Sequence, residues 1–559
     1  MYTQNFDPVS DSLGLTAIFA ALPVLTLFFL LGGLRMKAQW AALISLGVAM
    51  LVALIVYGMP LGQTLLSATE GGTFGIFPIM WIVISAIWVY NMTVATGHFA
   101  VLRRSFGAIS DDQRIQAVIV AFCFGALLEA LAGFGTPVAI TAVMLIALGF
   151  QPIKAASVAL VANTAPVAFG AIATPIITLS EVTELPKDDL GAMVGRQTPV
   201  LALIVPLILV YMVDGRRGVR QVWPVAVLGG ASFAVGQFLC SNYFSVELTD
   251  IVAALFATAM IVVFLRVWSP AEPLLGDSEG RFSQPAVAGG EAHDPAMERE
   301  IARRDDGTKD PVADVIKAYA PYAIIIAIFS IAQIPAVKDA LAESPWTTTF
   351  QWPGLDVANP DGEALSSLTF NLNWLPAAGT LMLISGLISM AVIGLSPGRA
   401  VRTFGETLNQ LKWAIVTVAA VLALAYVMNQ SGQTVTLGLW AAGAGGFFAF
   451  LSSLIGWLGV AVTGSDTSSN ALFGALQVTA AEDAGISSKL LAAANSSGGV
   501  LGKMVSPQNL AIGAAAVGMA GQEGDLFRKV LGWSLVLVLV MCVLVYLQST
   551  AVLDWMVIE

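Results

Sequence analysis

Three charged residues lie inside long apolar stretches of this sequence, where a charge is costly unless it is paired or faces a polar cavity. Glu129 has leucine and alanine on both sides, Asp466 follows a Gly-Ser pair, and Lys503 follows the segment GGVLG. Buried carboxyl groups often relay protons, and a buried ammonium can bind a carboxylate anion. We therefore predict that Glu129 and Asp466 are proton-coupling residues and that Lys503 binds the carboxylate of a substrate.

Each of these residues also has a structural interpretation. Glu129 could be a neutral acid that is hydrogen-bonded to a neighbouring helix break. Asp466 could be the N-cap of a helix, because TGSDTSSN contains the residue types that cap helices. Lys503 could pair permanently with Glu129 or Asp466 instead of with a substrate. The sequence leaves both interpretations of Lys503 open.

The segments around these charges contain one pattern of helix breakers and hydroxyl groups twice. ANTAPVAFGAIATP, at 162–175, aligns without a gap with ANSSGGVLGKMVSP, at 494–507. Upstream lies a second matched pair, GFGTP at 133–137 and GSDTS at 464–468. In a membrane a broken helix is stable only against protein or a water-filled cavity, because every backbone N–H and C=O needs a partner. Two breaks at matching positions indicate the binding site of a secondary transporter. The alternative is helix packing through small residues.

The neutral polar residues of the two breaks complete the predicted site. A helix N-terminus at a break offers free N–H groups to an anion, and unwound carbonyls and hydroxyls can hold a cation or a hydrated proton. We expect Asn163 and Asn495 on opposite sides of one pocket. The predicted substrate-binding residues, besides Lys503, are Thr136, Asn163, Thr164, Thr174, Thr467, Asn495, Ser496 and Ser506.

The composition is that of an integral membrane protein. Of the 559 residues, 57% are hydrophobic and 11% are charged, and the mean hydropathy is +0.81, whereas soluble domains contain about 25% charged residues. Apolar runs of about 20 residues, long enough to cross a bilayer, recur along the chain. We therefore predict an all-α polytopic membrane protein and not a β-barrel.

The charges and the scarce metal-binding residue types exclude several classes of function. The net charge of −11 comes mostly from acids in loops, which does not favour nucleic-acid binding. With two histidines in polar loops and three isolated cysteines, the chain lacks the material for a metal site or a Ser-His-Asp triad. We therefore expect no metal, no cofactor beyond the proton as coupling ion, and no enzymatic activity.

The chain divides into two transmembrane halves that a polar linker joins. We predict an N-terminal half at 1–268 with its breaks at 133–175, and a C-terminal half at 318–559 with its breaks at 464–507. The linker, 269–317, is rich in proline, glycine and charged residues. Such a composition predicts a largely disordered cytoplasmic segment.

Lysine and arginine alternate between successive loops, and this alternation predicts the orientation. By the positive-inside rule the basic loops are cytoplasmic and both chain termini lie outside. The polar stretch 335–375 is then an outward loop, in which we expect a short surface helix. The residues of the basic loops are Arg35, Lys37, Arg103, Arg104, Arg114, Arg216, Arg217, Arg220, Arg399, Arg402, Lys412, Arg528 and Lys529.

The same orientation predicts two inverted repeats. The span expected at 115–131 enters the first break from the cytoplasmic side, and the span expected at 437–458 enters the second break from outside. Such copies are related by a pseudo-two-fold axis in the membrane plane. The spans expected at 155–179 and 490–517 contain the matched Asn-to-Pro segments. Residues 137–148 are too few to cross the membrane, and we expect a re-entrant arm there.

Three segments, GFGTPVAI, ANTAPVAFGAI and GSDTSSNALFGALQ, closely resemble signature segments of the bacterial L-lactate permease family, over essentially the whole chain. The resemblance implies an importer of L-lactate, or of D-lactate or glycolate, that carries this small monocarboxylate with a proton across the inner membrane. It also implies the inverted-repeat architecture of ion-transporter-superfamily carriers. Ala173 departs from the glycine expected there. The expected partners are the monocarboxylate and the lipid bilayer, and a homodimer is a possible assembly.

Two other function classes compete with a proton-coupled carrier. An intramembrane hydrolase could use Glu129 and Asp466 as an acid pair, but the duplicated breaks would then be unexplained. An anion channel would need a filter-forming segment, and the sequence contains no evident one. Counterflow of labelled lactate in proteoliposomes, without hydrolysis and with saturation at low flux, distinguishes the carrier from both.

Overall fold

The computed structural model describes residues 1–34, 36–133, 135–274, 310–332, 334–519 and 522–558. This part of the chain is mostly helical, and nine of its helices are long and apolar enough to cross a membrane. The predicted all-α polytopic class is therefore confirmed. The apolar runs form helices because a helix in a membrane satisfies its backbone hydrogen bonds within one segment.

The first part of the chain forms helices from Leu13 onward. Helix α3 (Leu61–Phe74) continues through a π-helical turn, η2 (Gly75–Met80), into α4 (Trp81–Ala95). Helix α11 bends at Asp214 and Gly215, whose backbone angles are not helical. The other elements are α1 (Leu13–Phe28), η1 (Phe29–Gly33), α2 (Ala38–Ile55), α5 (His98–Gly107), α6 (Gln113–Gln116), η3 (Ala117–Phe124), α7 (Gly125–Ala132), α8 (Thr136–Ala147), α9 (Pro152–Ala162), η4 (Val167–Phe169), α10 (Gly170–Thr183), α11 (Lys187–Tyr243) and α12 (Thr249–Phe264).

The second part of the chain is also built from helices. Its first helix, α14 (Val312–Ala332), begins inside the range that the sequence assigned to the linker. The elements that follow are α15 (Pro335–Ala342), η5 (Ser366–Leu368), α16 (Ala378–Val392), α17 (Pro397–Ser431), α18 (Gln433–Ala442), η6 (Gly445–Phe447), α19 (Phe448–Thr463), α20 (Asp466–Ala484), α21 (Ser488–Gly502), η7 (Lys503–Val505), α22 (Pro507–Ala516), α23 (Glu523–Gln548) and η8 (Asp554–Met556).

Two of the expected spans are wrong. The span expected at 437–458 is interrupted, because α18 ends at Ala442 and α19 begins at Phe448. Gly445 between them has a left-handed φ of 57°, which glycine adopts at no steric cost. The apolar run at 413–428 also predicts a span, but this span is too short, because α17 begins at Pro397. The basic residues expected in a loop there, Arg399, Arg402 and Lys412, lie on this helix.

The spans that contain the matched Asn-to-Pro segments are also broken. Between α9 and α10 the chain bends by 65°, so the span expected at 155–179 is two helices. The span expected at 490–517 is divided by η7 into α21 and α22. Broken helices at these two places are the feature that the duplicated sequence pattern predicted.

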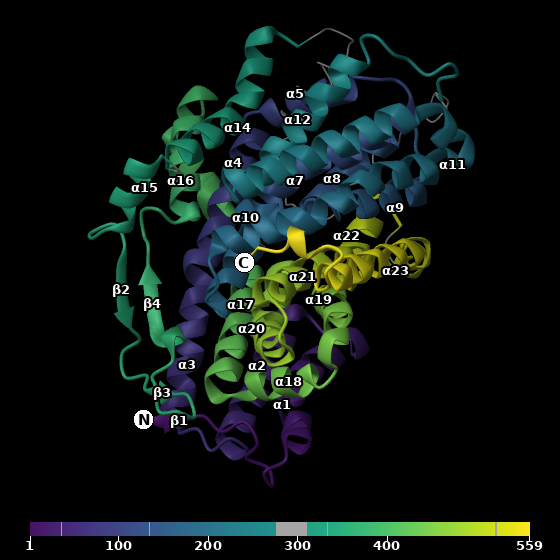
Figure 1. Ribbon diagram of the computed structural model, residues 1–559. Coiled ribbons are helices and arrows are strands. Elements are labelled where there is room, and N and C mark those ends of the chain that lie inside the picture. Colours follow the sequence, from purple (N-terminus) through teal and green to yellow (C-terminus); the bar gives the residue numbers. More distant parts are fainter. Residues whose placement is uncertain (35, 134, 275–309, 333, 520–521, 559) are drawn as a thin grey trace.

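Two groups of contacts join helices from early in the chain to helices from late in the chain. In the first group α17 packs on α2 and α3, α4 packs on α16, and α1 packs on α18. In the second group α10 packs on α20, α8 on α22, α9 on α23 and α11 on α21. Figure 1 shows the second group as blue-to-teal helices from the first part of the chain against green-to-yellow helices from its end. This packing brings the two sets of breaks together.

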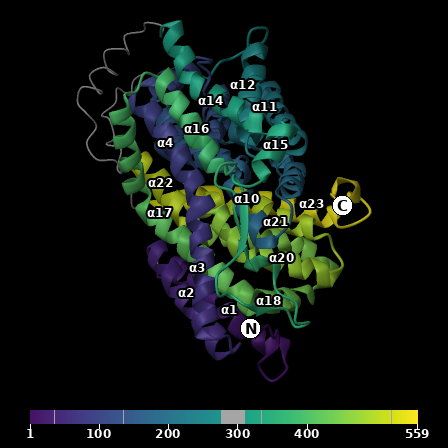
Figure 2. The ribbon, with the colours of Figure 1, turned by 90° about the vertical axis from the view of Figure 1, so that its left-hand side faces the viewer.

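Two small sheets lie outside the helices along one side of the molecule (Figures 1 and 2). Strand β1 (Tyr2–Thr3) pairs in parallel with β3 (Val357–Ala358), and β2 (Thr348–Gln351) pairs antiparallel with β4 (Thr369–Leu372). The short helix expected in 335–375 is present as α15. The strands of this stretch were not predicted from the sequence.

Most of the linker predicted at 269–317 falls at 275–309, outside the described residues. Its described ends are attached to helices. Arg104 Nη2 on α5 donates to Asp310 Oδ1 over 2.7 Å, and the backbone N–H of Gln113 donates to the carbonyl of Leu274 over 2.9 Å.

Candidate functional site

Glu129 and Lys503 form a buried ion pair between the two parts of the chain. Lys503 Nζ lies 2.6 Å from Glu129 Oε1, and the two residues are only 3% and 6% exposed. Glu129 lies on α7 one turn before the first break, and Lys503 follows the end of α21. Of the partners that the sequence suggested for Lys503, this structure pairs it with Glu129. Removing one partner of a buried pair leaves an uncompensated charge, at a cost of about 3–5 kcal/mol.

Glycine in the first break lets the carboxylate lie against the backbone. A Cβ atom on Gly170, the first residue of α10, would lie 2.8 Å from Glu129 Oε1. A Cβ atom on Gly133, directly after α7, would lie 3.2 Å from the same oxygen. Glycine at 170 therefore leaves the space that the carboxylate occupies.

Asn163 holds the second oxygen of this carboxylate. It ends α9, and its Nδ2 donates to Glu129 Oε2 over 2.9 Å. The helix cannot continue regularly past this point because Pro166 lacks an N–H and its ring clashes with the preceding turn. Asn163 Oδ1 has no hydrogen-bond partner in the described part of the chain. The Glu129 carboxylate thus receives a donor on each oxygen, while one amide oxygen of the break stays unpaired.

The entry to α10 has an unusual backbone. Ala171, Ile172 and Ala173 have φ angles of 44°, 57° and 56°, and a left-handed conformation costs roughly 1–2 kcal/mol per non-glycine residue. Ala173, where the resemblance led us to expect glycine, is one of these residues. The strained turn directs the start of α10 toward Glu129.

The second break differs from the first in its path. Asn495, which aligns with Asn163, does not end a helix, because α21 continues to Gly502. Asn495 Nδ2 donates to Asn470 Oδ1 over 2.9 Å, and Asn470 Nδ2 donates to the carbonyl of Pro175 over 3.1 Å. The second asparagine therefore connects α21 and α20 to the first break without contacting the ion pair.

Asp466 lies in the first turn of α20 and is 3% exposed. The N-cap is the preceding Ser465, whose hydroxyl accepts from the N–H of Ser468, so the capping role suggested for Asp466 is wrong. Ser496 Oγ donates to Asp466 Oδ2 over 2.5 Å. Asp466 Oδ1 has no partner among the described residues, although Lys503 is within electrostatic range. A Cβ atom on Gly499 would lie 2.3 Å from this oxygen.

The remaining predicted residues differ in their contacts. Thr164, Thr174 and Ser506 donate to the backbone carbonyls of Val161, Ala171 and Lys503, and the Ser506 hydroxyl also caps α22. Thr136 is half-buried at the start of α8, and Thr467 is buried in the first turn of α20. The structure thus brings Glu129, Asn163 and Lys503 into one network and places Asp466 and Ser496 beside it.

Asp250, a third buried acid, was missed by the sequence analysis. It lies in the first turn of α12, has no exposed surface, and is within electrostatic range of Glu129 and Lys503. Helix α12 packs on α7, which carries Glu129. The signal in the sequence was an acid at the start of an apolar run. From the sequence alone, such an acid is interpreted as the boundary of a membrane span.

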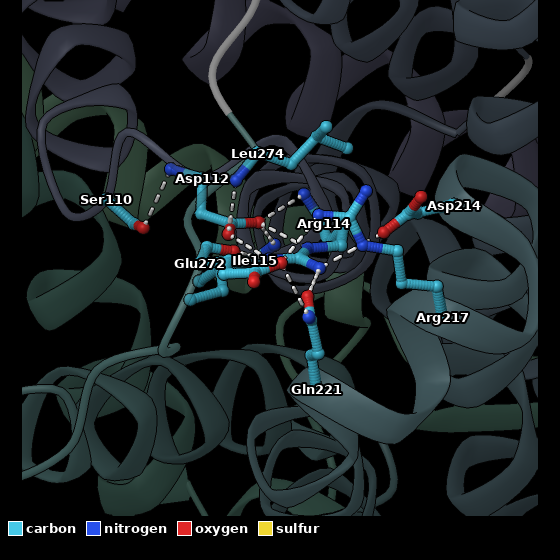
Figure 3. Close-up of polar contacts among 9 residues, drawn as sticks. All are labelled: Ser110, Asp112, Arg114, Ile115, Asp214, Arg217, Gln221, Glu272 and Leu274. Carbon is cyan, nitrogen blue, oxygen red and sulfur yellow. Dashed lines mark hydrogen bonds and ion pairs between the residues drawn. The ribbon is translucent and has the colours of Figure 1, made fainter.

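Arg114 fixes one end of these helices (Figure 3). Its fully buried guanidinium donates to Asp112 Oδ2 over 2.7 Å, to Asp214 Oδ2 over 3.1 Å, and to the carbonyl of Glu272 over 2.7 Å. Burial raises the pKa of Asp112, but hydrogen bonds from Arg114 and Leu274 and the charge of Arg114 outweigh burial and lower it below its ordinary value. The cluster ties the start of the α6 to α7 helix to the bend in α11 and the segment after α12.

The carboxyl groups of Glu129 and Asp466 are not hydrogen-bonded to each other in the described structure. Glu129 is held by Lys503 and Asn163, and Asp466 by Ser496. Two acids that share a proton need direct contact. The geometry therefore does not support the acid pair of the hydrolase hypothesis.

Residues 16–552 match the family model described as L-lactate permease. An L-lactate permease of Bacillus subtilis is 41% identical, and the match covers 100% of both chains. The glycolate permease GlcA of Escherichia coli is 40% identical over 98% of both chains. Among solved structures, the YdaH transporter of Alcanivorax borkumensis matches with a TM-score of 0.44 and 16% identity, covering 86% of this chain and 87% of that one.

Proposed function

Because the chain belongs to the L-lactate permease family, we propose that it is a secondary active transporter that imports a small 2-hydroxy monocarboxylate together with a proton. The substrate is L-lactate, or D-lactate or glycolate. Its relatives are named permeases, and the prediction that the chain is not an enzyme is confirmed. No cofactor beyond the coupling proton enters the proposal.

The observation that carries the proposal is the buried ion pair of Lys503 and Glu129. In this proposal the substrate carboxylate binds Lys503 in place of the Glu129 carboxylate. The displaced Glu129 would be an uncompensated buried charge, which is strongly unfavourable, unless it binds a proton. One substrate anion therefore enters with one proton, and the loaded site has the same net charge as the empty one.

Neutral groups around the pair supply a means of substrate selection. Asn163 Oδ1 is an unpaired acceptor beside the pair, and it can accept a hydrogen bond from the 2-hydroxyl of a bound substrate. An acid without this hydroxyl would leave the amide oxygen unsatisfied, at a cost of about 1–3 kcal/mol. In this proposal Thr164, Thr174 and Ser506 shape the backbone of the pocket through their contacts with carbonyl groups.

We also propose that the two halves, 1–268 and 318–559, are inverted repeats. Their breaks have matching sequences, and their helices pack reciprocally: α10 packs on α20 as α22 packs on α8, and α11 packs on α21 as α23 packs on α9. Reciprocal contacts of this kind support a pseudo-two-fold relation. The distribution of lysine and arginine supports an inner-membrane orientation with both termini outside.

Transport by purified protein in proteoliposomes tests this function. With an acidic exterior, we expect accumulation of labelled L-lactate above its external concentration, alkalinisation outside, and loss of both when a protonophore is added. Counterflow should persist without a pH gradient. Lactate that only equilibrates under every gradient contradicts proton coupling, non-saturating flux indicates a channel, and release of a hydrolysed product indicates an enzyme.

A further inference from the structure

Asp250 is a buried acid that the exchange at Lys503 does not use. Gln237 Nε2 on α11 lies 3.5 Å from Asp250 Oδ1, the limit of a hydrogen bond. Asp250 Oδ2 has no hydrogen-bond partner among the described residues. A buried carboxylate with so few donors is poorly stabilised as an anion. Asp250 is therefore most stable when it carries a proton.

The neighbours of Asp250 connect it to the first break. Gln237 Nε2 also donates to the carbonyl of Ala165 over 3.3 Å, and Gln237 Oε1 accepts from Thr198 Oγ1 over 3.1 Å. Ala165 is two residues from Asn163, which holds Glu129. The amide of Gln237 thus lies between Asp250 and the break that contains Asn163.

The charged and titratable groups near Asp250 favour the binding of one proton by its carboxylate. Glu129 on α7 and Lys503 in η7 act electrostatically on Asp250. The thiol of Cys240 on α11 and Glu247 in the preceding loop belong to the same surroundings, since Asp250 and Glu247 both act electrostatically on that thiol. Lys503 compensates Glu129, and Glu247 is compensated by Lys187. No cation remains for Asp250 among these groups, so proton binding neutralises it.

Asp250 lies between Glu129 and the loop before α12. Asp250 lies in the first turn of α12, and α12 packs on α7, which carries Glu129. The two acids therefore lie on neighbouring helices. In the chain before Asp250, Tyr243 and Phe244 are 74% and 50% exposed, whereas residues 245–248 are buried.

We propose that Asp250 is a proton-relay residue that passes the transported proton from the loop at 244–248 to Glu129. The proposal rests on the proton-coupled function above. When the substrate displaces Glu129, the Asp250 O–H bond breaks, its proton crosses a bridging water molecule, and an O–H bond forms on Glu129. Asp250 then regains a proton from the side of the 244–248 loop. That loop is outward in the orientation proposed above.

The test compares net uptake with exchange in Asp250→Asn. The amide is neutral and of similar size, so lactate counterflow at equal pH should remain within about twofold of the parent. Net uptake driven by an acidic exterior should fall at least tenfold, and raising the external pH should no longer change its rate. Asp250→Glu, which restores a carboxyl, should recover part of the net uptake. Glu406→Gln removes a 61% exposed carboxyl on α17 and serves as the matched control with parental behaviour.

Three results overturn the relay. If Asp250→Asn keeps the net uptake of the unmodified protein, Asp250 is a structural acid. The proposed transport function then still stands, provided that the unmodified protein is proton-coupled. Equal loss of counterflow and net uptake in folded Asp250→Asn also shows a structural role. If transport by the unmodified protein is not coupled to protons, the proposed function and the relay are both wrong. If Asp250→Asn does not fold, Asp250→Ser is measured for the same split.

Discussion

The two breaks have matching sequences but contribute different chemistry. The first supplies the acid and a strained turn: Glu129 packs against Gly170, and three consecutive residues have left-handed φ angles. The second supplies the cation: α21 stays helical through Asn495, and Lys503 follows it directly. Lys503 aligns with Ala171 of the first copy, so a charge stands where the other copy has a small apolar side chain.

This difference indicates how a duplicated helix break can bind a substrate anion together with a proton. If both breaks carried the same residue at these positions, the site would hold two like charges or no charge. Here the cation of the second copy neutralises the acid of the first. A substrate anion that competes for the cation must leave the acid protonated. Changes on the two sides of the pair should therefore have different consequences for binding and for proton coupling.

The largest effect is expected from Lys503→Met, which removes the cation and keeps most of the stem. Without the ammonium, lactate binding should weaken at least a hundredfold, about 2.7 kcal/mol or more, and Glu129 would be a lone buried charge unless protonated. Isothermal titration with purified protein measures the binding. Lys412→Met, at an exposed position on α17, is the control.

A double variant decides between the two roles of Lys503. Lys503→Met with Glu129→Gln removes both charges and should recover thermal stability but not lactate binding. Parental binding in Lys503→Met would show that the substrate carboxylate binds elsewhere. Recovery of transport in the double variant would show that Lys503 serves only the internal pair.

Glu129→Gln should separate binding from coupling. The neutral amide competes only weakly for Lys503, so lactate should bind independently of pH, whereas lactate binding to the unmodified protein should weaken as the pH rises, because it takes up one linked proton. Counterflow should persist, and accumulation driven by a pH gradient should be lost. Parental accumulation in Glu129→Gln would make Glu129 a structural residue.

Much of the arrangement could be predicted from the sequence because polar residues are rare in membrane segments. Glu129, Asn163 and Lys503 were all identified, since each interrupts an apolar run. Their partnership could not be derived, because the spacing of 374 positions between Glu129 and Lys503 contains no information on which helices pack together. The sequence therefore could not decide whether Lys503 binds a substrate carboxylate or the carboxylate of a buried acid.

The errors have identifiable physical causes. The span expected at 437–458 fails because hydropathy does not register the turn at Gly445. The equivalence of Asn163 and Asn495 fails because Pro166 stops α9, whereas its aligned partner, Gly498, permits α21 to continue. Asp250 was missed because an acid at the start of an apolar run usually marks a membrane boundary, and only the packing of α12 on α11 and α7 buries it.

The two aligned asparagines should respond unequally to alanine. Asn163→Ala removes the amide oxygen that we propose accepts a hydrogen bond from the 2-hydroxyl of lactate, a loss of about 1–3 kcal/mol, and should weaken lactate binding about tenfold. Asn495→Ala affects only the contacts with Asn470 and Gln477 and should weaken binding by about threefold, or roughly 0.7 kcal/mol. Half-saturation concentrations of counterflow measure both. If neither variant changes them, the pocket lies elsewhere.

Gly170→Ala should disturb the acid side of the pair without removing a charge. The new Cβ atom would lie 2.8 Å from Glu129 Oε1, and overpacking of this kind costs about 1–3 kcal/mol. We expect a lower melting temperature and weaker lactate binding. Gly47→Ala on α2, where a Cβ atom meets nothing within 4 Å, is the control. Equal behaviour of the two variants would show that the carboxylate can move freely.

The smallest effect is expected from Ala173→Gly, at the departure from the expected glycine. Ala173 has a left-handed φ of 56°, and glycine avoids the steric cost of roughly 1–2 kcal/mol but gains conformational freedom in the unfolded chain. The net result should be a stabilisation of up to about 1 kcal/mol, measured as a small rise in melting temperature in detergent, with parental lactate binding. Ala156→Gly, in the regular helix α9, should instead destabilise by about 1 kcal/mol. A similar loss in both variants would show that the left-handed turn at the entry to α10 is not strained at Ala173.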